Sequence, residues 1–184
     1  MTSRSARLFV CLGAIVAFGS MAHAQTDGGP LQLTIACEDA SEFLFRVTVE
    51  NVGASPTAAI VGSILGNDRT YVPGPLTFTV SRPGVADSTI DYPVVNHVGG
   101  RLDQWLIQLP AGASYSMVVP VPAGFRSIPM RFRDLLSMPA GVHVQLKTQE
   151  HHISSLDLQG QRFIRVWVGT LTSPRIRFPE SCRR

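Results

Sequence analysis

The 184-residue sequence has three cysteines, a single lysine at position 147, and charged residues amounting to only 16% of the chain. Basic residues outnumber acidic ones by 16 to 13, too small an excess for the concentrated positive surface of a nucleic-acid-binding protein. No Gly-x-Ser-x-Gly elbow, His-Glu-x-x-His helix, phosphate-binding loop or Cys-x-x-Cys pair occurs in the sequence. These absences favour a protein that is not an enzyme, needs no cofactor and binds no nucleic acid.

The N-terminus has the three-part layout of a secretory signal peptide. Arg4 and Arg7 precede an apolar run from Leu8 to about Phe18, and small residues follow up to Ala24. This layout predicts a signal peptide over residues 1–24 and one mature domain over residues 25–184, in the periplasm or secreted. An uncleaved anchor is the alternative, but the apolar run is shorter than the ~20 residues that span a bilayer. We therefore expect no stable membrane span after cleavage.

Two cysteines, Cys37 and Cys182, remain after that cleavage. In an oxidising compartment an even pair favours one disulfide, which here joins the start of the domain to its end. Two free thiols or a bridge between two molecules are the alternatives.

The mature chain has the alternation of β-strands almost throughout, because apolar residues recur at every second position. Segments with this pattern or a β-branched composition cover residues 31–37, 43–51, 57–65, 76–80, 141–149, 162–171 and 175–178. A short edge strand is expected near residues 90–95, a loop over 66–75, and a hairpin over 103–121 around a Pro-Ala-Gly turn. Residues 131–138 are the one helix candidate. Trp105 and Trp167 are expected to anchor the core, with Gly169 and Pro174 bending the last strand.

Many short strands separated by Gly/Pro turns predict an all-β fold, an antiparallel β-sandwich with one short helix. An up-and-down barrel is the alternative arrangement of the same strands. Four segments carry a resemblance: "VENVGASPT", "LPAGASYSMVVPV", "MPAGVHVQLKTQ" and "RVWVGTLTSPRIRF". Their order resembles the immunoglobulin-like (Ig-like) domains of bacterial secreted proteins, which implies an Ig-like β-sandwich and says little about function. The sequence departs from the family at His143, where the family often has a tyrosine.

The strongest cluster of polar residues combines three imidazoles with a carboxylate, the ligand types of Zn²⁺ and Cu²⁺ sites. The candidate metal ligands are His143, Glu150, His151 and His152. A corner histidine beside a solvated loop is the alternative interpretation. Asp87, Asp91 and Asp103 are weaker candidates for a calcium site, since no regular loop spacing relates them. Closely spaced arginines predict an anion-binding patch or, more simply, a solvated face; they are Arg131, Arg133, Arg162, Arg165, Arg175 and Arg177.

These patterns together favour an exported, non-enzymatic Ig-like module. Such a module binds another envelope or extracellular protein, or contributes to an envelope assembly, through loops at one end or through an exposed sheet edge. A secreted peptidase inhibitor is one alternative, with candidate loops at 53–57, 97–101 and 150–160. A metal-binding protein that uses His143, His151 and His152 is the other.

Overall fold

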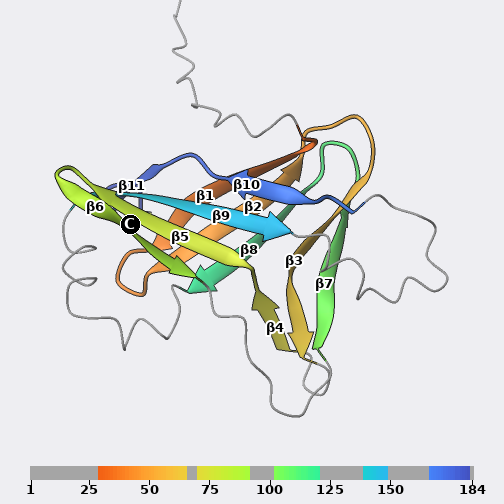
Figure 1. Cartoon of the computed structure of the whole chain (residues 1–184), viewed down its shortest axis with the longest axis horizontal. Helices are drawn as coiled ribbons and strands as arrows, with labels where there is room; N and C mark the ends of the chain where they lie inside the picture. The colour runs from red at the N-terminus through yellow and green to blue at the C-terminus, as the bar shows by residue number, and fades with distance from the viewer. Residues whose placement is uncertain (1–28, 66–69, 92–101, 121–138, 149–165, 183–184) are drawn as a thin grey trace, which may run out of the picture.

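The computed structural model describes residues 29–65, 70–91, 102–120, 139–148 and 166–182, and eleven strands lie within these ranges. All the strand ladders among them are antiparallel (Figure 1). The described ranges contain no helix, and therefore none long and apolar enough to cross a bilayer. The helix expected over 131–138 lies outside them.

The first sheet has the order β1-β2-β8 and presents one apolar face. Its strands are β1 (Leu31–Asp39), β2 (Leu44–Asn51) and β8 (Ser114–Pro120). Every second residue of β2 is buried, and the register places Val47 beside Ile35 on one side and Met117 on the other. Because side chains alternate between the faces of a strand, this register assembles all the apolar residues of the three strands on one face.

The second sheet has the order β10-β9-β5-β6, with β11 also paired to β9. Its strands are β5 (Leu76–Arg82), β6 (Val85–Asp91), β9 (Ala140–Thr148), β10 (Gly169–Thr172) and β11 (Ile176–Phe178). Strands β5 and β6 join through Pro83-Gly84, a turn pair with proline and glycine at its favoured positions. The edge strand is therefore present but begins five residues before the predicted Ile90. Residues 92–95 of the prediction lie outside the described ranges.

The two sheets stack face to face and enclose the core. The ring of Phe45 on β2 lies 5.7 Å, between centroids, from both Phe78 on β5 and Phe178 on β11. Leu31, Leu33, Val47, Val49, Val144 and Leu146 are fully buried between the sheets. The predicted all-β antiparallel sandwich is therefore confirmed.

A third sheet, of order β4-β3-β7, lies to one side of the sandwich (Figure 1). It contains β3 (Thr57–Leu65), β4 (Thr70–Pro73) and β7 (Leu102–Leu109). Strand β3 is rich in small residues, and Ala58 and Ala59 are fully buried. A Cβ on Gly62 would clash with the carbonyl oxygen of Val72 and lie 2.8 Å from the Trp105 ring, so only glycine fits there.

Two predictions fail in this third sheet. Residues 70–73 are strand β4 rather than loop, because Thr70, Tyr71 and Val72 are good strand formers that pair with β3. Strands β7 and β8 do not form the predicted hairpin: β7 pairs with β3, whereas β8 pairs with β2. The Pro-Ala-Gly turn is present, with the Ala113 N–H donating to Pro110 O at 3.0 Å, but it carries the chain from one sheet to another.

The C-terminal segment is fastened to β9 by a serine. Val144 N–H donates to the Ser173 hydroxyl at 2.9 Å, and Ser173 N–H donates to Val144 O at 2.9 Å. The Ser173 side chain thus bridges the gap in the ladder between β10 and β11, directly before Pro174. Gly169 has φ of +148°, and a Cβ on it would lie 2.9 Å from the Trp167 ring. The predicted interruption of the last strand is confirmed around Pro174, since β10 ends at Thr172 and β11 begins at Ile176.

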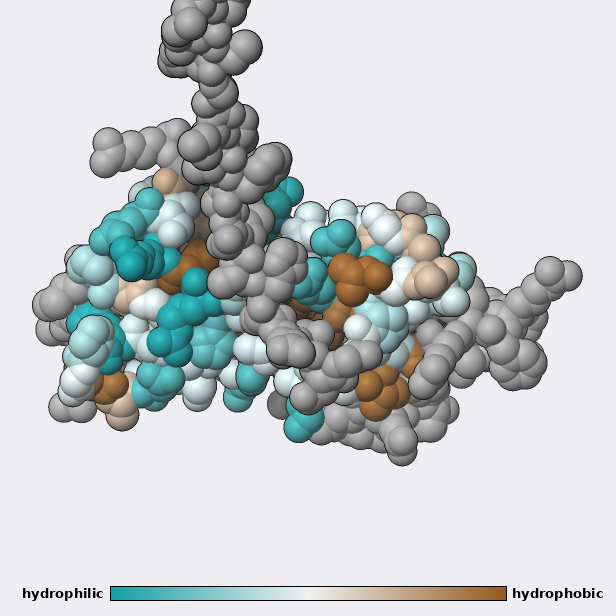
Figure 2. All heavy atoms as spheres, turned by 90° about the horizontal axis from the view of Figure 1, so that it is seen from above, coloured by the Kyte–Doolittle hydropathy of each residue, from teal (hydrophilic) through white to brown (hydrophobic). Residues whose placement is uncertain are grey.

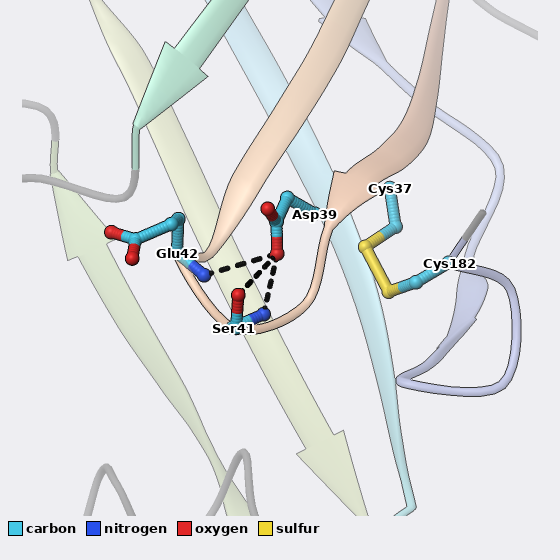
Figure 3. Close-up of a disulfide and its surroundings, with 5 residues drawn as sticks. All are labelled: Cys37, Asp39, Ser41, Glu42 and Cys182. Atoms are coloured by element: carbon cyan, nitrogen blue, oxygen red, sulfur yellow. Dashed lines mark hydrogen bonds between the residues drawn. A yellow bond between two sulfur atoms is a disulfide. The ribbon is translucent and has the colours of Figure 1, made fainter. Parts of the chain in front are cut away.

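A disulfide joins Cys37 on β1 to Cys182, as the cysteine count predicts (Figure 3). The two Cα atoms are 4.5 Å apart and 145 residues apart in sequence. Cys37 is almost fully buried, and the turn after β11 presents Cys182 through a bond from its N–H to Pro179 O. The first strand of the sandwich is therefore tied covalently to the turn that follows the last strand.

Candidate functional site

Only one of the four predicted metal ligands lies in the described part of the chain. His143 sits on the outer face of β9, opposite Thr79 of β5. Partial burial lowers the pKa of His143, and the positive charge of Arg175 lowers it further. The negative charge of Asp87 acts in the opposite direction. Glu150, His151 and His152 fall in the undescribed segment 149–165. Within the described ranges no three histidine, cysteine or acidic side chains gather into a metal site, so the histidine metal site stays a prediction.

The three aspartates considered for calcium lie on two different sheets. Asp87 and Asp91 belong to β6, whereas Asp103 belongs to β7. Thr77 Oγ1 donates to Asp91 Oδ1 at 2.6 Å. Of the paired arginines, Arg175 and Arg177 are exposed, and the other four lie outside the described ranges.

The loop over residues 52–56 contains most of the first candidate inhibitor loop and is held by a buried asparagine. Asn51 is fully buried, and its Nδ2 donates to Ser55 O at 2.9 Å and to Leu109 O at 2.8 Å. Its Oδ1 accepts from Gly53 N–H at 3.0 Å. Val52, the first residue of the loop, is by contrast 56% exposed. The loop is thus fixed at its base and presents an apolar side chain to solvent. The candidate loops at 97–101 and 150–160 lie outside the described ranges.

An aromatic cluster lies where the third sheet meets β8, and we call Tyr71, Trp105 and Tyr115 the aromatic surface. The Tyr71 and Trp105 ring centroids are 4.7 Å apart with planes tilted by 56°. Trp105 and Tyr115 are 5.8 Å apart and nearly perpendicular, at 82°. Both geometries are favourable for aromatic pairs, each worth about 0.5–1.5 kcal/mol beyond burial. Tyr71 is 53% exposed, while the other two rings pack partly against the core.

The strands fix the aromatic surface in place. Trp105 lies across the bare backbone of Gly62, and Tyr71 faces Ile64 on the next strand. Burial, and then the neighbouring Tyr71, raises the pKa of the Tyr115 hydroxyl. Tyr115 therefore keeps its proton at neutral pH, and its hydroxyl can donate a hydrogen bond. The result is a rigid apolar surface with polar groups on it, suited to contact with another molecule.

Among the described residues, the other large hydrophobic side chains that are exposed are Val52, Val85, Val118 and Val168. Seen from above, the coloured part of the molecule has small separate hydrophobic patches among polar residues (Figure 2). Isolated apolar residues are normal on a protein surface, so the aromatic surface stands out because its three rings touch.

Sequence reasoning found parts of this surface without assembling it. It placed Trp105 in the core and Tyr115 on an apolar strand face, but it placed Tyr71 in a loop. The signal for β4 was the short run Thr70-Tyr71-Val72 directly before a Pro-Gly-Pro turn.

Comparison with known proteins adds no assignment: no protein family, no curated protein and no solved structure matches this chain.

Proposed function

We propose that this protein is an exported, non-enzymatic Ig-like module that binds a protein partner of the envelope or the extracellular space through the aromatic surface. The exposed and rigidly held Tyr71, backed by Trp105 and Tyr115, is the observation that carries the proposal.

Tryptophan and tyrosine dominate the energetics of protein–protein contacts, because they bury a large area and lose little conformational entropy. In the aromatic surface the contacts between the rings already restrict their rotation. A partner therefore meets a preorganised surface, and less of the binding energy is spent on ordering side chains.

Two features support export. The N-terminal sequence has the signal-peptide layout, and the Cys37–Cys182 disulfide suits an oxidising compartment. The resemblance to Ig-like secreted domains agrees with the sandwich, and binding modules are common on that architecture.

Affinity capture with matched variants tests the proposal. The full chain is produced with its N-terminal segment, purified in oxidised form, and used as bait for extracytoplasmic extract of the source cells. Tyr71→Ser removes the exposed ring, and Val118→Ser is the control because Val118 is similarly exposed, at 46%, but outside the aromatic surface. We expect a protein that both the wild type and Val118→Ser recover and that falls at least about tenfold with Tyr71→Ser. Equal recovery by all three baits would contradict the proposal.

Peptidase inhibition is a second candidate, favoured by the loop over 52–56. A loop that Asn51 holds at its base loses little entropy when it enters a peptidase cleft. Assays against serine, cysteine and metallo-peptidases test this function. Inhibition that Val52→Asp abolishes supports it, and no inhibition across the panel removes it.

A further inference from the structure

Strand β6 forms one edge of the second sheet and carries none of the residues of the aromatic surface. Within the described ranges β6 pairs with β5 alone, and no described strand lies along its other edge (Figure 1). Such an edge carries backbone N–H and C=O groups that another extended segment can pair with.

The side chains of β6 alternate cleanly. Asp87, Thr89 and Asp91 are exposed on the outer face, whereas Ser88 and Ile90 are partly buried on the inner face. Ile90 stands beside Phe78, which in turn stands beside Val144. The row of core residues therefore reaches the rim at Ile90, and a strand added there could extend it by one more apolar residue.

The charges on the outer face disfavour a second copy of this chain as the occupant. An antiparallel pairing of two β6 strands about Thr89 places Asp87 of one copy opposite Asp91 of the other, twice. Like charges directly opposite one another on neighbouring strands are destabilising. The same two carboxylates favour a strand with basic residues four positions apart.

We propose that β6 binds an extended basic segment of a partner polypeptide by strand addition. The segment has the pattern basic-apolar-any-apolar-basic, with its basic side chains beside Asp87 and Asp91 and its apolar side chains beside Ser88 and Ile90. The pattern reads the same in both directions, so it holds for a parallel or an antiparallel guest. Backbone pairing supplies affinity, and the side chains supply selectivity.

Peptide binding to the oxidised full chain tests this proposal. The probe is a fluorescent, end-capped peptide with the core Lys-Val-Thr-Val-Lys, and its matched control has Glu in place of both Lys. Fluorescence anisotropy at low salt should show the basic peptide binding at least about tenfold more tightly, as two surface ion pairs and two removed repulsions imply. Equal binding of both peptides, or no binding of the basic one, overturns the proposal.

Two further measurements test whether the peptide binds at β6 and whether it binds by strand addition. Asp87→Asn with Asp91→Asn should weaken the basic peptide about threefold to tenfold, and Asn at 91 keeps an oxygen that accepts from Thr77. Glu42→Gln with Glu180→Gln makes the same change in net charge elsewhere and should leave binding within twofold, about the scatter expected for a distant pair. Equal loss in the two double variants overturns the assignment to β6.

N-methylation of the probe distinguishes strand addition from mere charge attraction. An edge strand pairs through alternate residues, so methyl groups on one alternating set of amide nitrogens should reduce binding by about tenfold or more. The other set should be tolerated. Equal tolerance of both sets overturns strand addition. The Tyr71→Ser variant should bind the peptide as tightly as the wild type does. If the peptide does not bind, the proposal for β6 fails but the proposal for the aromatic surface stands. Loss of the capture result in the Tyr71 experiment would likewise leave the β6 proposal standing.

Discussion

Breaking the Cys37–Cys182 bond should cost this fold a large share of its stability. The bond closes a loop with a sequence separation of 145. In the chain-entropy model a loop of that length contributes about 5 kcal/mol at 25 °C. Typical domains have a total unfolding free energy of only about 5–15 kcal/mol, so loss of the bond should move the protein close to its unfolding threshold.

The packing of the two cysteine side chains makes a second contribution to the stability that is lost. Cys37 is 1% exposed and packs in the core beside the Phe45 strand, while Cys182 packs against the core more loosely. Cys37→Ala with Cys182→Ala removes both the crosslink and the sulfur packing, whereas reduction removes the crosslink alone. The variant should therefore lose about 1 kcal/mol more than the reduced wild type.

Urea unfolding monitored by tryptophan fluorescence measures both quantities. Reduction should lower the unfolding free energy by several kcal/mol and raise the slope against urea, because the uncrosslinked unfolded chain exposes more surface. A reduced protein that unfolds within about 1 kcal/mol of the oxidised one would refute the loop-entropy reasoning for this domain.

Four further predictions concern single residues. Asn51→Ala should cost about 2–4 kcal/mol in urea unfolding, because the carbonyl oxygens of Ser55 and Leu109 lose the buried amide donor and the Gly53 N–H keeps only its longer bond to Pro30 O; a cost below 0.5 kcal/mol would contradict the role given to this side chain. Ser173→Ala should cost about 1–3 kcal/mol by leaving the Val144 N–H without an acceptor, and hydrogen exchange at that amide should quicken. Gly62→Ala should cost about 1–3 kcal/mol through overpacking against β4, and unchanged stability would show that the two strands lie further apart. Because the pKa of His143 is lowered in the folded state, the unfolded state takes up a proton first as the pH falls. The unfolding free energy should therefore decrease from about pH 6.5 downward, through the folded-state pKa. His143→Gln should reduce this decrease, and identical pH profiles of stability for the variant and the wild type would contradict the prediction.

The sandwich was predictable because burial imposes a period of two on its strands. Strand β3 matches its predicted range at both ends, and β1, β2 and β9 match within two residues. The disulfide was predictable for a different reason: once Cys11 is assigned to the predicted signal peptide, only one pairing within the chain remains. Each of these inferences rests on a local pattern or a count.

The errors concern information that local patterns do not contain. Strands β7 and β8 flank a Pro-Ala-Gly turn, which favours a hairpin. Their actual partners are β3 for β7 and β2 for β8, and both partners lie outside the local stretch of sequence that suggested the hairpin. Strand β4 is four residues long between turn signals, too short for periodicity to reveal. The aromatic surface needs β4, β7 and β8 placed together, so no single stretch of sequence could show it.

The central claim is that the aromatic surface contacts a partner protein, and photocrosslinking in living cells tests it most directly. A photoreactive phenylalanine derivative replaces Tyr71 in the full chain, and a second strain carries it at Val118. We predict a discrete adduct with one extracytoplasmic protein after irradiation of the first strain, and none with that protein in the second. No adduct at position 71, or the same adducts at both positions, would contradict the account.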